Sequence, residues 1–158
     1  MKFACLVDGF NLYHSLRDAI ADGAPESVKW LDIKKLAVAK LENSFPGAIL
    51  EATYYFTSDV GKKGSPPHQN QQVYVRALRS HGVSVEFGHF KSRKWICDFC
   101  KRENIRTVEK RTDINIAVQL IRLLHEGHDG CMIVIGDSDL AGAVKTAKIM
   151  FPDKRENF

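Results

Sequence analysis

The stretch Lys2-Phe3-Ala4-Cys5-Leu6-Val7-Asp8-Gly9-Phe10-Asn11 decides the fold class of this chain. Residues 2–7 are rich enough in apolar side chains to form a strand that is buried on both faces. Residues 8–11 follow as a turn, and apolar side chains then recur at helical spacing at Leu12, Leu16, Ala19 and Ile20. A buried strand followed directly by an amphipathic helix is typical of parallel α/β folds.

Strands and helices alternate along the rest of the chain. Asp32 suits the N-cap of a helix that runs through about Glu42. We predict further strands at Ile49–Phe56, Val83–Phe87 and Cys131–Ile135, and further helices at Gln69–Ser80, from Thr112 to Leu124, and in a last segment ending near Met150. This order predicts an α/β fold with helices on both faces of a central, mainly parallel sheet of four to five strands. A final strand after Met150 is expected to be missing or only a stub.

The length and composition are those of one globular domain. The chain has 158 residues, of which 44% are hydrophobic and 27% charged, so we expect a single domain over residues 1–158 with an irregular basic insertion at about 89–111. It contains no apolar run of about 18 residues, so we expect no membrane partner.

The start of the chain bears on its location. It lacks the charged n-region of a signal peptide, so we expect a cytoplasmic protein. The net charge of +4 gives mild support for a polyanionic partner.

Aspartates stand where ligands bind in open parallel sheets, beyond the carboxyl ends of the strands. Asp8 follows the first predicted strand, Asp137 and Asp139 follow the fourth, and Asp113 begins the helix between the insertion and the fourth strand. If the first and fourth strands are neighbours, these four carboxylates face one crevice. Like charges that close repel each other, so the cluster predicts a divalent cation, and Mg²⁺ and Mn²⁺ prefer oxygen ligands. The alternative is that each aspartate caps a helix or serves its dipole.

Three segments resemble the motifs of one known family. Val7-Asp8-Gly9-Phe10-Asn11-Leu12 is similar to the opening motif of NYN domains, the PIN-like nucleases of LabA type. Glu109-Lys110-Arg111-Thr112-Asp113-Ile114-Asn115-Ile116-Ala117 resembles their second motif, and Ile135-Gly136-Asp137-Ser138-Asp139-Leu140 resembles their third. The three occur in the family's order, and the resemblance covers nearly the whole chain.

The resemblance implies a PIN-like three-layer α/β/α fold and cleavage of RNA assisted by Mg²⁺ or Mn²⁺. Carried over by position, Asp8, Asp113, Asp137 and Asp139 are the implied catalytic metal ligands. The implied substrate-binding residues are Asn11, Ser138, Lys110 and Arg111: Asn11 orients Asp8 or contacts substrate, Ser138 fixes the turn or reaches a phosphate, and basic side chains hold the RNA backbone. The family usually continues into another strand, and only a short segment follows Met150 here. A sheet that lacks its edge strand can need a partner subunit, so we expect a homodimer.

The insertion carries a second candidate site. Cys97 and Cys100 have zinc-knuckle spacing, but tetrahedral zinc needs four ligands and only two are local. His89 offers a third. A redox pair and an unmetallated pair are the alternatives. Basic residues beside Trp95 and Phe99 suit single-stranded RNA, and a solvated charged loop is the alternative there.

Three functions remain as hypotheses. The first is a metal-dependent endoribonuclease that acts on single-stranded RNA. The second is a non-catalytic RNA- or protein-binding regulator with the same fold. The third is a phosphatase-like hydrolase with Asp8 as nucleophile, and Phe10 argues against it because such enzymes usually carry a second aspartate at that position.

Overall fold

Strand β1 (Lys2–Asp8) is the centre of the molecule, which is described by a computed structural model over residues 1–96, 99–100, 103–110, 112–136 and 138–157. It belongs to a five-stranded sheet with β2 (Ile49–Thr57), β3 (Ser84–Phe87), β6 (Gly130–Val134) and β7 (Arg155–Asn157). The strand order is β3-β2-β1-β6-β7, and every neighbouring pair is parallel. The first strand and the predicted fourth strand, β6, are therefore neighbours, as the candidate site requires.

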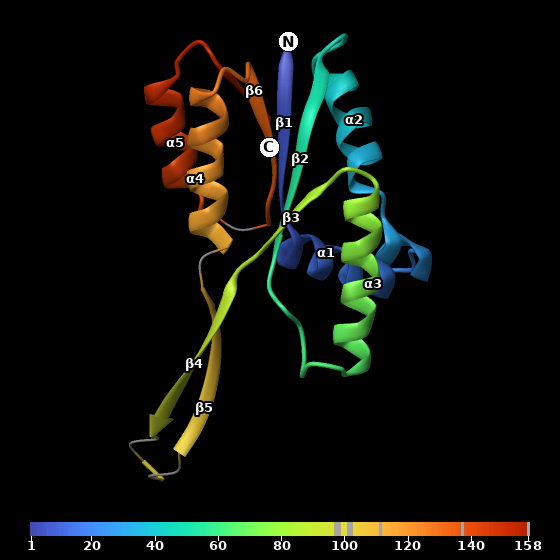
Figure 1. The fold of residues 1–158 in the computed structure, drawn as a ribbon, viewed down its shortest axis with the longest axis vertical. Helices are drawn as coiled ribbons and strands as arrows, with labels where there is room; N and C mark the ends of the chain where they lie inside the picture. Colours follow the sequence, from blue (N-terminus) through green and yellow to red (C-terminus); the bar gives the residue numbers. More distant parts are fainter. Residues whose placement is uncertain (97–98, 101–102, 111, 137, 158) are drawn as a thin grey trace.

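Helices cover both faces of this sheet (Figure 1). On one side lie α1 (Gly9–Ala21), α2 (Ile33–Ser44) and α3 (Pro66–Ser80), with a short 3₁₀ helix, η1 (Glu26–Trp30), between the first two. On the other side lie α4 (Thr112–His125) and α5 (Ala141–Met150). The predicted three-layer α/β/α fold is confirmed.

The side chains of β1 alternate between two apolar clusters, as the period of a strand requires. Phe3, Cys5 and Val7 lie in the cluster that includes residues of α2 and α3. Ala4 and Leu6 lie in the cluster that includes residues of α4 and α5. Cys5 is fully buried in this core, and burial raises the pKa of its thiol to about 12, which disfavours the reactive thiolate.

The predicted start of one helix was wrong, whereas the expected stub of a final strand is confirmed. Helix α3 begins at Pro66 rather than near Gln69, because a proline in the first turn of a helix removes only an N–H that has no intrahelical partner. The sheet gains β7, which pairs with β6 through Gly130–Arg155, Cys131–Glu156 and Met132–Asn157. The expected stub after the last helix is therefore a three-residue strand.

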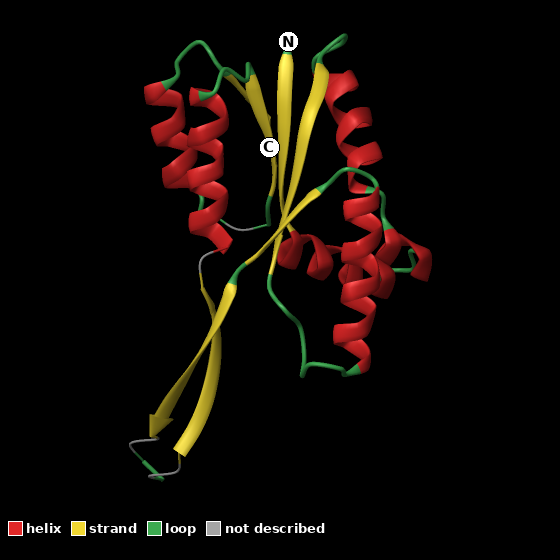
Figure 2. Cartoon of the chain, viewed as in Figure 1, coloured by secondary structure: helices red, strands yellow, loops and turns green. Residues whose placement is uncertain are grey.

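The segment predicted to be irregular forms a hairpin instead. Strands β4 (His89–Ile96) and β5 (Glu103–Lys110) pair in antiparallel fashion, from His89 opposite Lys110 to Ile96 opposite Glu103. They form a sheet of their own, and Figure 2 shows them reaching away from the central sheet. The prediction failed because a two-stranded ribbon satisfies its backbone hydrogen bonds by pairing alone, without the alternation that marks a half-buried strand.

In the part of the chain that the structure describes, none of the helices is long and apolar enough to cross a membrane.

Candidate active site

Asp8 is the last residue of β1 and the N-cap of α1. One of its carboxylate oxygens, Oδ1, accepts the backbone N–H groups of Phe10 and Asn11, both at 2.9 Å. The residue is only 4% exposed, and β1 is flanked by a strand on each side. A buried carboxylate is costly unless it is hydrogen-bonded or neutralised. The capping role weighed for single aspartates is thus real at Asp8, and it also fixes this carboxylate at the middle of the sheet edge.

Asn11 links Asp8 to the loop that follows β6. Its side-chain Nδ2 donates to the second oxygen of Asp8, Oδ2, at 3.0 Å. On its other side lies Gly136, where a Cβ atom would stand only 3.3 Å from Oδ1 of Asn11. The first and third sequence motifs therefore meet at Asn11, although more than 120 residues separate them.

Asp113 and Asp139 lie at the same edge of the sheet. Leu6, Ile116 and Leu140 belong to one apolar cluster, and Asp113 precedes Ile116 by three residues on α4, a spacing that shares a helix face. Asp139 directly precedes Leu140. Figure 1 shows the start of α4, the end of β6 and the start of α1 together at this edge. Both carboxylates are exposed, so Asp8 is the buried one of the three.

The other predicted site residues divide into described and undescribed ones. Ser138 is exposed in the same loop as Asp139, and Lys110 ends β5, directly before the approach to α4. Cys100 is exposed in the turn between β4 and β5. Asp137, Arg111 and Cys97 lie outside the described residues. Zinc at Cys97 and Cys100 and a homodimer stay predictions.

The donor chemistry of this edge fits a hard divalent cation. Carboxylate oxygens are the ligands that Mg²⁺ and Mn²⁺ prefer, and Asp8 is already oriented by three hydrogen bonds. Among the described residues, no three His, Cys, Asp or Glu side chains form a ready metal-binding group. Asp137, the fourth predicted ligand, is not one of those residues.

A cavity that the sequence did not reveal lies next to Asp8. It has a volume of about 380 Å³, and aromatic residues from α1, η1, β2 and α3 line it. Gly9 lines the cavity and packs against the ring of Tyr55. Only glycine fits there, because a Cβ atom at Gly9 would stand 2.3 Å from Cζ of Tyr55. The only signal in the sequence was a set of aromatics scattered over four segments, which no local pattern connects.

The parallel sheet with helices on both faces is that of an α/β domain with a PIN-like fold. The family model described as the NYN domain matches residues 2–150, and the chain therefore belongs to the NYN domain family. No curated protein matches it. The crystal structure of a protein of unknown function from Vibrio parahaemolyticus is similar in fold, with a TM-score of 0.60 and 20% sequence identity, over 98% of this chain and 78% of that one.

Proposed function

We propose that this protein is a metal-dependent ribonuclease that cuts single-stranded RNA internally. The observation that carries the proposal is the buried, triply hydrogen-bonded carboxylate of Asp8 at the carboxyl edge of the sheet. Membership of the NYN family, a PIN-like nuclease family that is generally metal-dependent, supports a nucleic acid substrate. A cytoplasmic location belongs to the same proposal.

Each residue of the edge has a role in this proposal. Asp8, Asp113, Asp137 and Asp139 would hold Mg²⁺ or Mn²⁺, which when bound supplies an acidified water and stabilises charge on the phosphodiester. Asn11 holds the Asp8 carboxylate in one orientation through its hydrogen bond to Oδ2. Ser138 is exposed beside Asp139 and would contact a phosphate. Lys110 and Arg111 would hold the RNA backbone by charge.

The test is cleavage of a labelled, mixed-sequence single-stranded RNA in Mn²⁺, in Mg²⁺ and in EDTA. We expect metal-dependent cutting by the wild-type protein and a loss of about 100-fold or more in Asp8→Asn, in the range found when an essential group of a transition state is removed. Asparagine caps a helix about as well as aspartate, so Asp8→Asn should stay folded. Asp32→Asn is the matched control, because Asp32 is also an N-cap aspartate but lies outside the site.

A residue exchange sharpens the test. Asp8→Asn combined with Asn11→Asp keeps the net charge, the pair of hydrogen-bonding groups and a capping side chain, but moves the carboxylate by three positions. We expect this double variant to fold and to be inactive. Wild-type rates in Asp8→Asn, or cutting that survives EDTA, would refute the site. A folded wild-type protein that binds RNA and cuts under no condition would instead be a non-catalytic RNA-binding regulator.

A further inference from the structure

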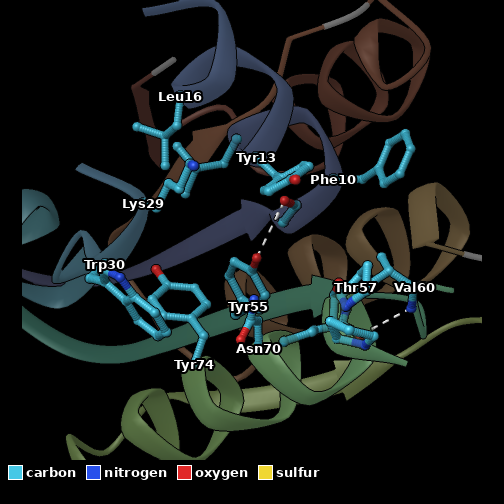
Figure 3. Close-up of a pocket in the computed structure, with 15 residues that line it drawn as sticks. Phe10, Tyr13, Leu16, Lys29, Trp30, Tyr55, Thr57, Val60, Asn70 and Tyr74 are labelled. Atoms are coloured by element: carbon cyan, nitrogen blue, oxygen red, sulfur yellow. Dashed lines mark hydrogen bonds between the residues drawn. The ribbon is translucent and has the colours of Figure 1, made fainter. Parts of the chain in front are cut away.

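The cavity beside Asp8 has walls of aromatic rings, several of them open to solvent. Trp30 is 53% exposed and Tyr13 is 47% exposed. In Figure 3 the rings of Trp30, Tyr74 and Tyr55 follow one another along one side, and Phe10 and Tyr13 stand on the side of α1. The cavity volume of about 380 Å³ is at the lower end of the range of about 300–1,000 Å³ for small-molecule sites.

The deeper part of this wall is rigid. The ring centroids of Trp30 and Tyr74 are 6.1 Å apart, those of Tyr74 and Tyr55 are 5.9 Å apart, and both pairs meet edge to face. The hydroxyl of Tyr74 donates to the carbonyl of Leu31 at 2.8 Å, and that of Tyr55 donates to the carbonyl of Gly9 at 3.3 Å. These bonds fix the two tyrosine rings, so the wall is preformed for a flat apolar ligand.

The polar groups of the cavity suit the edge of a base. No carboxylate is among the described residues that line it, and its cationic residue, Lys29, is ion-paired with Glu26. The amide of Gln71 is occupied by Thr57, Ser58 and Val60. The side chain of Asn70, by contrast, has no hydrogen-bond partner among the described residues, so its amide is available to donate to and accept from the edge of a base.

The cavity adjoins the candidate active site through the sequence neighbours of Asp8. Gly9 and Phe10 line it and directly follow Asp8, and Thr57 lines it and follows Phe56, the partner of Asp8 in the β1–β2 register. A nucleotide with its base in the cavity would therefore bring the adjacent phosphate toward Asp8.

We propose that this cavity binds one unpaired nucleobase of the RNA strand, stacked on Trp30 and Tyr13, next to the phosphate that is cut. The proposal rests on the proposed ribonuclease function and adds to it a subsite for one base of the substrate. Bases in a duplex are stacked on their neighbours and cannot enter such a cavity, whereas the bases of single strands can. The cavity thus selects single-stranded RNA.

The test measures binding rather than cleavage, so that it does not depend on catalysis. Fluorescence anisotropy in EDTA compares a labelled mixed-sequence RNA octamer with a ribose-phosphate octamer that has no bases. We expect the wild-type protein to prefer the complete RNA, and the ratio of the two affinities to fall on the order of tenfold in Trp30→Leu, since one stacked base contributes about that much. Tyr13→Leu, with leucine as a good helix former, is the second variant.

Phe151→Leu is the matched control, because Phe151 packs in the other apolar cluster, with α4 and α5. It should leave the ratio unchanged. The same ratio in wild type, Trp30→Leu and Tyr13→Leu, with all three folded by circular dichroism, would overturn the proposal. The proposal would also be overturned if the wild-type protein did not bind the octamer. It would be overturned as well if the protein bound a duplex of the same sequence equally well and Trp30→Leu weakened binding of the duplex as much as binding of the single strand.

The two proposals fail separately. If Asp8→Asn cuts RNA like the wild type while Trp30→Leu loses its preference for bases, the catalytic site is wrong and the base cavity stands. If Asp8→Asn is inactive while Trp30→Leu keeps both its preference and its cleavage rate, the cavity is wrong and the catalytic site stands.

Discussion

At the residue scale, Asn11 leaves little room for a methyl group at Gly136. Alanine there would place its Cβ 3.3 Å from Oδ1 and 3.5 Å from Cβ and Cγ of Asn11, so Asn11 must shift and loosen its bond to Asp8. We expect Gly136→Ala to raise the Mn²⁺ concentration needed for half-maximal cleavage about 10- to 100-fold. Losses of this size are usual when a group that orients a metal ligand is disturbed. The overall stability should change little, because Gly136 is exposed.

The measurement is the Mn²⁺ concentration at half-maximal cleavage, with thermal unfolding alongside. Gly142→Ala is the control, because nothing lies within 4 Å of a Cβ at Gly142 in α5 and alanine favours a helix over glycine by about 1 kcal/mol. If both alanine variants show the metal dependence of the wild type, Asn11 does not position Asp8 for a metal.

The sequence revealed the local part of this site and missed the part that depends on distant segments. Asp8 and Asn11 are three residues apart, and capping geometry is set within one helical turn. The sequence predicted a parallel sheet but left the pairing of β1 with β6 as a condition, which the structure meets. The cavity did not follow, because Trp30, Tyr55 and Tyr74 come from η1, β2 and α3 and are brought together only by the packing of the whole layer.

At the element scale, α2 depends on its N-cap. Oδ1 of Asp32 accepts the backbone N–H of Lys35 at 3.1 Å, and this bond holds the pKa of Asp32 below its ordinary value of 3.8. Because the folded pKa is the lower one, the stabilisation is present above the unfolded pKa and is lost as the pH falls through the folded pKa. Asp32→Ala should therefore cost about 1 kcal/mol of unfolding free energy near neutral pH and progressively less in acid.

Urea unfolding of the wild type and Asp32→Ala at about pH 7 and about pH 3 checks this sign. Asp32→Asn keeps a capping oxygen without the titrating charge, so its difference from Asp32→Ala should not depend on pH. A cost of Asp32→Ala that is equal at both pH values would mean that the carboxylate does not stabilise α2 through its charge.

The elements that the sequence predicted best are those that bury one face or both. Helix α2 was predicted from its capping residue and its apolar positions, and β1 and β6 from their apolar runs. The hairpin of β4 and β5 was missed because its basic residues gave no alternating apolar face to read. Backbone pairing between the two adjacent arms of the hairpin, rather than an apolar pattern, makes these two segments strands.

At the scale of the whole molecule, positive charge is concentrated in the hairpin region. The chain has 23 lysine and arginine residues, and eight of them lie between residues 91 and 111. Figure 1 shows β4 and β5 projecting beyond the carboxyl edge of the sheet, and β5 leads directly toward α4. Such an arm would extend the contact with an RNA strand by charge, largely without regard to sequence.

Excision of the hairpin tests this arm. His89 pairs with Lys110, and paired Cα atoms of antiparallel strands are about 5 Å apart, so a two-residue Asn-Gly turn can replace residues 90–109. We expect the shortened protein to fold and to cut RNA at saturating concentration. It should bind RNA more weakly, and the slope of log affinity against log salt should become shallower by about 0.7 for each phosphate contact that is lost.

The control is the double variant Lys40→Gln and Lys145→Gln, which removes two exposed lysines on α2 and α5. It lowers the net charge without touching the hairpin, so it should leave the slope nearly unchanged. If the excised protein keeps the wild-type slope, RNA does not pass over the hairpin. If the control double variant flattens the slope as much as the excision does, net charge rather than the arm attracts the RNA. If the excised protein fails to fold, the hairpin is part of the folding unit and not an insertion into it.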